Sequence, residues 1–178
     1  MGRYNMASTS RAVRDLKFEK GELTIANGSE RYILIPLRAY GALYDSIEEI
    51  VGDAVSGVLY AAGKSIGRGL AEEIKRRMDE RKVSGLEELA RDAVKLLEEL
   101  GFGKVELVES RPEKFIVRMY SSATSVHARK GKAVCHLERG MLAGIAEDIM
   151  GKHYVAREVK CRAKGDPYCE FIIMESKY

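Results

Sequence analysis

The sequence of 178 residues contains no tryptophan, no glutamine, three prolines and only two asparagines, Asn5 and Asn27. No stretch approaches the roughly 18 consecutive apolar residues that a membrane-spanning helix requires. The N-terminus carries basic residues, but it lacks the apolar segment and the small-residue cleavage site of a secretory signal. These absences argue against a membrane span and against export, and we expect a cytoplasmic protein.

A strong excess of either charge is missing as well. Thirty Lys and Arg residues stand against twenty-seven Asp and Glu residues, which gives a formal net charge of +3, and the two signs are interleaved along the chain. A surface dedicated to nucleic acid normally gathers positive charge on one face. We therefore expect no nucleic-acid partner.

Length and composition indicate one domain of ordinary core size. We expect a loose N-terminal arm over residues 1–11 and a single domain over residues 12–178. Amide side chains are scarce while Glu, Lys and Arg are abundant, a bias that is typical of thermophilic proteins. We infer that the source is a thermophile.

Short alternating runs of apolar residues occupy the segment from Leu16 to Leu37. They are interrupted at Lys20-Gly21 and at Asn27-Gly28, which predicts strands joined by tight turns. Pro36 is expected to end the last of these strands, because proline cannot donate a ladder hydrogen bond.

Apolar residues then recur at steps of three and four from Tyr40 to Met78, which predicts a long amphipathic helix. We expect a break near Gly63 to Gly69, because each glycine inside a helix costs about 1 kcal/mol relative to alanine. Ser84 and Glu87 have the spacing of a capping box and predict the start of a second helix, which ends at Gly101.

Strand periodicity returns after this helix. Val105–Leu107 and Phe115–Met119 predict a β-hairpin, residues 134–150 predict a third helix, and Tyr154–Met174 predicts a final hairpin. Strands, helices, strands, a helix and strands again indicate an α+β fold with a largely antiparallel sheet.

The run from Gly57 to Ser65 ends in Gly-Lys-Ser, as a phosphate-binding loop does. Val58 stands where that motif requires its first glycine, and the run lies in a helical stripe whose backbone N–H groups are already engaged. We reject a nucleotide site here. Instead we expect Gly57, Gly63 and Gly67 to let another helix approach closely, and their smooth face beside an apolar stripe predicts a homodimer through the long helices.

All three cysteines, Cys135, Cys161 and Cys169, lie in the last quarter of the chain. A reducing cytoplasm argues against a stable disulfide, although thermophiles are an exception, and one thiol would in any case stay unpaired. Three thiols suit a zinc site, which takes four tetrahedral ligands. The alternative is that they are core residues, since free cysteine is among the most buried residue types. The clustering favours the metal.

The residues alone leave the fourth ligand open among His136, His153 and Glu158. Glu158 and Cys161 would point to opposite faces of a regular strand, so a bulge or twist near Lys160 would be needed to bring both to one ion. On a helix, His136 would face away from the cysteine that precedes it. On periodicity alone, His153 competes with Glu158.

Three C-terminal segments carry a family resemblance: Cys135–Gly144 (CHLERGMLAG), Glu158–Cys161 (EVKC) and Gly165–Phe171 (GDPYCEF). They resemble the 4-vinyl-reductase domain, most strongly from Cys135 to Ile173 and less so back to about Tyr40. That family includes archaeal proteins described as hydrocarbon-binding, an accessory protein of bacteriochlorophyll synthesis and aromatic-sensing domains of bacterial transcriptional activators. The resemblance implies an antiparallel sheet with long helices packed on one side, a fold shared by aromatic sensors and vesicle-tethering subunits.

The resemblance also selects the fourth metal ligand. It places the family's zinc site on Cys135, Glu158, Cys161 and Cys169. These residues form a subsite within residues 134–174. Because four protein ligands leave no open position, the implied zinc is structural and would tie the third helix to the last hairpin.

An apolar pocket between the helices and the sheet is a further implication of the resemblance. Its walls are expected to include Tyr44, Tyr60, Met119 and Tyr120, although each also has a plain core explanation. The chain would then act as a sensor, carrier or accessory subunit for a hydrocarbon, an aromatic or a tetrapyrrole-like molecule. The family's aromatic sensors carry a tryptophan in this pocket, and its absence here argues against a phenol-like ligand.

Catalysis is the less favoured interpretation. The sequence contains no glycine-rich dinucleotide loop and no nucleophile spaced with a histidine in a known arrangement. His127 lies among serines and threonines and is assigned to a surface loop. The alternative to ligand binding is a scaffold or tethering-type dimer subunit without ligand, and a reductase acting on a vinyl group ranks below both.

Overall fold

The computed structural model describes residues 16–25, 31–82, 84–125 and 130–177. Its contacts divide the chain into two compact units, Met1–Pro36 and Leu37–Tyr178, where the sequence predicted a single domain over residues 12–178. The expected arm over residues 1–11, the Asn27-Gly28 turn and His127 lie outside the described residues. Within the described ranges, no helix is both long enough and apolar enough to cross a membrane.

The first unit contains a small antiparallel sheet. Its strands are β1 (Leu16–Glu19), β2 (Glu22–Ile25) and β3 (Arg31–Tyr32). Lys20 and Gly21 join β1 to β2 with φ angles of 52° and 83°, the left-handed conformation that suits a two-residue hairpin. The predicted strands and this turn are confirmed. The expectation that Pro36 ends the last strand is wrong, because β3 already ends at Tyr32.

The second unit begins with two helices in place of one interrupted helix. These are α2 (Leu37–Val51) and α3 (Val55–Arg81), separated by a short 3-10 turn, η2 (Gly52–Ala54). The predicted break near Gly63 to Gly69 is wrong, since α3 runs through those glycines. The chain breaks instead at Gly52, whose φ of 57° is easily adopted only by a residue without a side chain.

The glycines inside α3 face another helix, α5 (His136–Met150). A Cβ atom placed on Gly63 would lie 2.2 Å from the carbonyl oxygen of Leu137, and one placed on Gly140 would lie 2.2 Å from that of Tyr60. Gly67 and Gly144 make equivalent backbone contacts. The absence of side chains on both helices therefore allows their backbones to touch, which explains why α3 tolerates glycine in its interior.

This contact confirms the expected close approach for Gly63 and Gly67 but not for Gly57. Gly57 is exposed, and a Cβ atom there would meet nothing within 4 Å. The two buried glycines are covered by α5 of the same chain, so they offer no free face to a second copy. The homodimer stays a prediction, without the glycine face as its basis.

The next helix, α4 (Leu86–Glu99), confirms the predicted second helix but not its capping box. Its N-cap is Gly85, with a φ of 120°, and no side chain caps the helix. The helix starts one position later than a box with Ser84 as N-cap requires. Glu87 therefore lies in the first turn, where it pairs with Arg91 at 2.6 Å.

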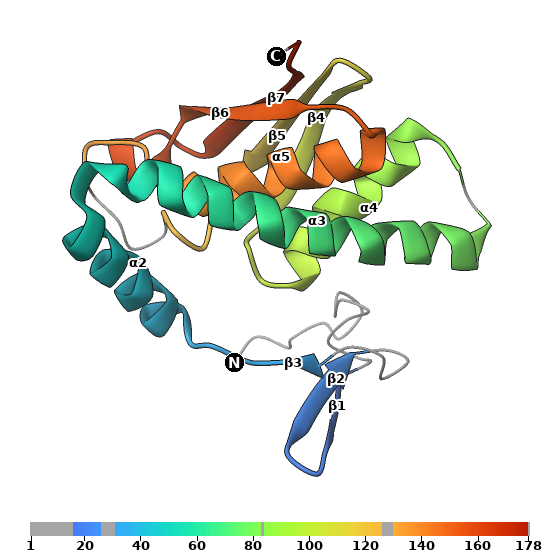
Figure 1. Ribbon diagram of the computed structural model, residues 1–178, viewed down its shortest axis with the longest axis horizontal. Coiled ribbons are helices and arrows are strands. Elements are labelled where there is room, and N and C mark those ends of the chain that lie inside the picture. The colour runs from blue at the N-terminus through green and yellow to red at the C-terminus, as the bar shows by residue number, and fades with distance from the viewer. Residues whose placement is uncertain (1–15, 26–30, 83, 126–129, 178) are drawn as a thin grey trace, which may run out of the picture. The chain divides into compact units, whose positions relative to one another are not determined.

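Four antiparallel strands form the main sheet in the order β4-β5-β7-β6. Their bounds are β4 (Val105–Arg111), β5 (Lys114–Met119), β6 (Tyr154–Lys160) and β7 (Cys169–Glu175). The helices cover one side: α4 packs on β4, α5 packs on β6 and β7, and α3 lies against α5 and α4 (Figure 1). This arrangement confirms the predicted α+β fold, both hairpins and the third helix.

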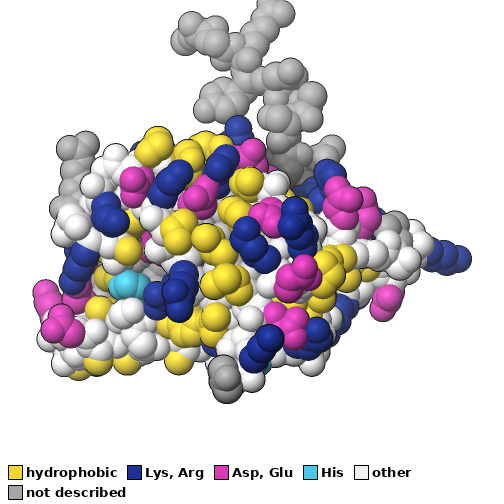
Figure 2. All heavy atoms as spheres, turned by 90° about the horizontal axis from the view of Figure 1, so that it is seen from above, with side chains coloured by type: hydrophobic (Ala, Val, Ile, Leu, Met, Phe, Trp, Pro, Cys, Tyr) yellow, Lys and Arg dark blue, Asp and Glu magenta, His cyan; other side chains and the backbone are white. Residues whose placement is uncertain are grey.

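Charges of both signs are mixed on the face of the molecule that Figure 2 shows. Lys and Arg side chains lie next to Asp and Glu side chains there, with hydrophobic side chains between them. Pairs across the main sheet have the same character, since Arg118 on β5 lies 2.7 Å from Glu170 on β7. The interleaving of charges along the chain therefore continues on this face, where positive charge is not gathered into one patch.

Candidate metal centre and apolar cavity

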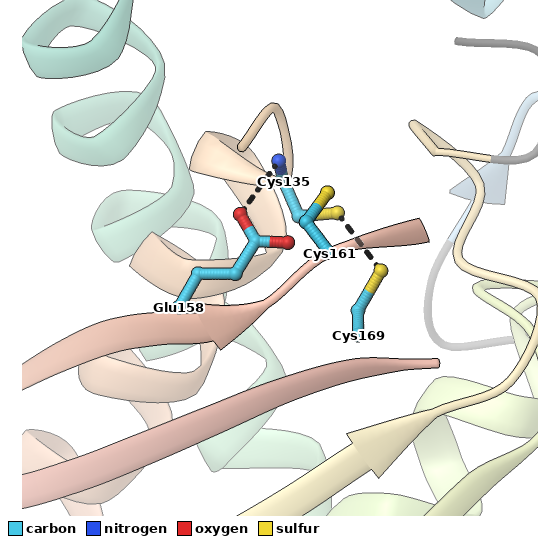
Figure 3. A group of neighbouring side chains, drawn as sticks. All are labelled: Cys135, Glu158, Cys161 and Cys169. Carbon is cyan, nitrogen blue, oxygen red and sulfur yellow. Dashed lines mark hydrogen bonds between the residues drawn. The ribbon is translucent and has the colours of Figure 1, made fainter. Parts of the chain in front are cut away.

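Four side chains converge at one end of the main sheet. Cys135 caps the N-terminus of α5, Glu158 lies on β6, Cys161 follows β6 directly, and Cys169 begins β7. One potential ligand atom of each lies within 4.8 Å of those of the other three (Figure 3). The structure thus brings together the set that the family resemblance indicated.

A strand irregularity places Glu158 and Cys161 on the same side. The pairing of β6 with β7 shifts register between Glu158 and Lys160, so one extra residue is accommodated there. An extra residue reverses the alternation of side chains beyond it, and Cys161 then points toward the same space as Glu158. The bulge that the sequence required for this ligand pair is confirmed.

Hydrogen bonds hold the four groups in place. The backbone N–H of Cys135 donates to Glu158 Oε2 at 3.1 Å, and the N–H of Arg162 donates to Cys169 Sγ at 3.4 Å. The Ser122 and Ser125 hydroxyls lie 3.3 Å from the sulfur atoms of Cys135 and Cys169, respectively. Neutral donors around buried thiolates are the usual supporting shell of a metal site.

The spacing and chemistry of the four groups fit a zinc ion. A tetrahedron with zinc–sulfur bonds of about 2.3 Å places its sulfur atoms about 3.8 Å apart. Cys135 Sγ and Cys169 Sγ are 3.5 Å apart, and all three cysteines are fully buried. Glu158 Oε1 is also buried and has no hydrogen-bond partner among the described residues. A buried, unpartnered carboxylate oxygen beside three thiols is what a cation at this position would satisfy.

Proton affinities in the cluster differ widely. Burial, together with a hydrogen bond to the Cys161 thiol, raises the pKa of Glu158 to about 8. Hydrogen bonds from the thiols of Cys135 and Cys161 lower the pKa of Cys169 to about 4. Without a cation, the cluster therefore retains protons that a metal would displace on binding.

Neither competing histidine belongs to this group. His153 Nδ1 lies 2.7 Å from Glu147 Oε1, and the His153 side chain is 51% exposed. His136 faces the other way, with its ring stacked on that of Tyr44 at a centroid distance of 6.4 Å. The structure thus agrees with the resemblance, rather than with periodicity, in preferring Glu158.

Sequence reasoning missed Glu138, which is fully buried next to the cluster. Its Oε1 accepts hydrogen bonds from Ser122 Oγ at 2.9 Å and from the N–H of Thr124 at 3.0 Å. Ser122 in turn contacts Cys135, so Glu138 holds the loop that supports the thiol. Its spacing of three residues from Cys135 on a helix was the available signal, since such residues share a face.

An apolar cavity lies between α4, α5 and the sheet, and all fourteen of its lining residues are hydrophobic. It encloses about 470 Å³ of space not filled by atoms, part of which is open to solvent. The walls from the three layers include Leu89, Ala93, Leu142, Ile145, Phe115 and Ile173.

None of the four predicted pocket residues lines this cavity. Tyr44 lines a separate depression beside Tyr40, and Met119 is fully buried on β5 opposite Cys169. The Tyr60 hydroxyl accepts a hydrogen bond from the N–H of Ala156 at 3.3 Å. Tyr120 is 36% exposed. The structure therefore does not bring these four side chains together, and their ligand-binding role stays a prediction.

Solved structures with the same fold include sensors and a trafficking subunit. The phenol-responsive sensory domain of the transcription activator PoxR aligns over 92% of this chain and 86% of its own, with 20% identity and a TM-score of 0.75. A trafficking protein particle complex subunit 3 from Naegleria fowleri, covalently bound to palmitic acid, aligns over 80% and 93%, with 15% identity and a TM-score of 0.60. These likenesses confirm the predicted fold class.

Archaeal proteins resemble the chain in both structure and sequence. A vinyl-4-reductase family protein from Methanocaldococcus jannaschii aligns in structure over 82% of this chain and 85% of its own, with 23% identity and a TM-score of 0.57. The uncharacterized protein MJ0150 of the same organism is 33% identical over 142 residues, covering 79% of this chain and 76% of the relative. The family model of the vinyl-4-reductase domain matches residues 115–175, which contain all four residues of the cluster. The chain belongs to the vinyl-4-reductase domain family.

Proposed function

We propose that this protein binds a small apolar molecule in the cavity between α4, α5 and the sheet. The observation that carries the proposal is the lining, which is hydrophobic at every position. Each square ångström of apolar surface removed from water contributes about 25 cal/mol, and a cavity of this kind recovers contacts when it is filled. The neighbours support it, since one is a phenol-responsive domain and another carries palmitic acid.

We propose further that the Cys135, Glu158, Cys161 and Cys169 cluster holds a structural zinc ion. Four protein ligands complete a tetrahedral shell, which leaves no position for substrate or water. The ion would join the start of α5 to the end of β6 and the start of β7. Because α5 supplies one wall of the apolar cavity, the metal would stabilise that wall without contacting the ligand.

Ethylbenzene is a suitable first probe, because it is small and apolar. We expect its binding to the zinc-loaded protein to be detectable by isothermal titration calorimetry. Ala146 lines the cavity, so Ala146→Leu should fill part of it and weaken binding at least about tenfold. Ala42→Leu is the matched control, because Ala42 is exposed on α2 and adds the same atoms elsewhere.

Three results would separate the alternatives. Binding that Ala146→Leu weakens and Ala42→Leu leaves unchanged supports the proposal. Binding that neither variant changes would place the ligand outside this cavity. An absence of binding, together with a stable dimer by native mass spectrometry, would favour a scaffold subunit without ligand.

A further inference from the structure

A polar groove lies next to the apolar cavity, between α4 and the edge strand β4. Val94 and Leu107 line both spaces, which shows that the groove and the cavity are neighbours. The groove is otherwise lined by polar and charged side chains and by Val108, which is 42% exposed at a bulge of β4. A ligand in the cavity that extends past Val94 and Leu107 would therefore meet polar groups.

One of these polar groups, the hydroxyl of Ser110, has no partner within the described part of the chain. Ser110 pairs across the sheet with Phe115, and residues directly opposite each other in an antiparallel pair project to the same face. Phe115 lines the cavity, so Ser110 belongs to the same, helix-covered face of the sheet. Its Oγ atom is buried and makes no hydrogen bond to any described residue. A buried hydroxyl without a partner is unfavourable, and the loss is recovered when a partner arrives.

The charged side chains of the groove, by contrast, are already paired. Arg91 lies 2.6 Å from Glu87. Glu109 lies 2.9 Å from Lys114 and 3.3 Å from Arg111. Each charged residue that lines the groove in the described ranges thus has a counter-charge, so nothing there calls for an ionic head group. The group that lacks a partner is the neutral hydroxyl.

We infer that the natural ligand is a neutral amphiphile, with an apolar body in the cavity and one hydrogen-bonding group that meets Ser110 Oγ. This inference rests on the proposed function and narrows its ligand class. A pure hydrocarbon would leave Ser110 unsatisfied. An ionic ligand would have to compete with the Glu87–Arg91 and Glu109–Lys114 pairs.

Benzyl alcohol and ethylbenzene test the inference, because they have the same shape and differ in one hydroxyl against one methyl group. The quantity to compare is the ratio of their dissociation constants, measured by calorimetry in the parent and in each variant. We expect Ser110→Ala to weaken benzyl alcohol about three- to tenfold and to leave ethylbenzene unchanged, because one hydrogen bond is lost. Ser110→Thr keeps the hydroxyl and should preserve the parent ratio. Ser46→Ala, at an exposed position of α2, is the control.

The outcomes distinguish this inference from the proposed function. If both compounds bind and the ratio changes in Ser110→Ala alone, the inference is supported. If both bind and the ratio is the same in every variant, the inference is refuted while the apolar cavity stands. If neither binds, the proposed function fails and the inference fails with it.

Discussion

Replacing Gly67 by alanine tests the contact between α3 and α5 on which the helix layer depends. A Cβ atom on Gly67 would lie 2.2 Å from the carbonyl oxygen of Met141 and 2.9 Å from its carbonyl carbon. Carbon–oxygen contacts in proteins ordinarily lie at about 3.3–3.6 Å. Both obstructing atoms belong to a helix backbone, so no side-chain rotation relieves the overlap, and α3 and α5 would have to separate by roughly 1 Å.

The cost follows from the packing that this separation loosens. A gap of about 0.5–1 Å forfeits a quarter to a half of the dispersion energy of each contact across it. Overpacking costs about 1–3 kcal/mol and sometimes more, and alanine returns only about 1 kcal/mol through its better helix propensity. We expect the free energy of unfolding to fall by about 3 kcal/mol. For a chain of this size, the melting temperature should fall by roughly 6–12 °C.

Gly69→Ala is the matched control in the same helix. Gly69 is exposed, and a Cβ atom there would meet nothing within 4 Å. Propensity alone then applies, and this variant should gain about 1 kcal/mol. Urea unfolding followed by far-ultraviolet circular dichroism gives both differences. If Gly67→Ala is as stable as Gly69→Ala, the backbone contact does not govern the packing of these helices and the reasoning is refuted.

The metal and the ion pairs yield two further predictions. The parent should contain one zinc ion per chain by elemental analysis. Cys161→Ser and Cys169→Ser should each lower the melting temperature more than Glu158→Gln, which keeps an oxygen donor; parent and variants melting alike, with or without chelator, would mean that the cysteines are only core residues. Glu147→Gln should cost about 1–3 kcal/mol near neutral pH, because Glu147 accepts a hydrogen bond from Lys64 at 2.5 Å. Burial alone would raise the pKa of Glu147, but this bond and others hold it below its ordinary value. The stability that Glu147 contributes is therefore present above its unfolded pKa of about 4.3 and is lost as the pH falls below it, so denaturant curves of parent and variant should converge in acid.

Local patterns in the sequence determined most elements of the second unit. The steps of three and four from Tyr40 onward and the alternation from Val105 and Tyr154 identify helices and strands, because periodicity depends only on neighbouring residues. The clustering of three cysteines indicated a metal site in the same way. The residues also stated the condition for Glu158 to join that site, a bulge near Lys160, without showing that the bulge exists.

Only the tertiary structure decided features that depend on residues far apart in the chain. Gly63 is interpreted as a helix breaker until Gly140 is found against it, because the benefit of a missing side chain lies in the other helix. The cavity was likewise misplaced, since its walls come from α4, α5 and three strands, and no local pattern shows which faces will leave space between them. Ser110 is an ordinary strand residue in the sequence. Its missing hydrogen bond becomes visible only when helix and sheet close over it and water is excluded.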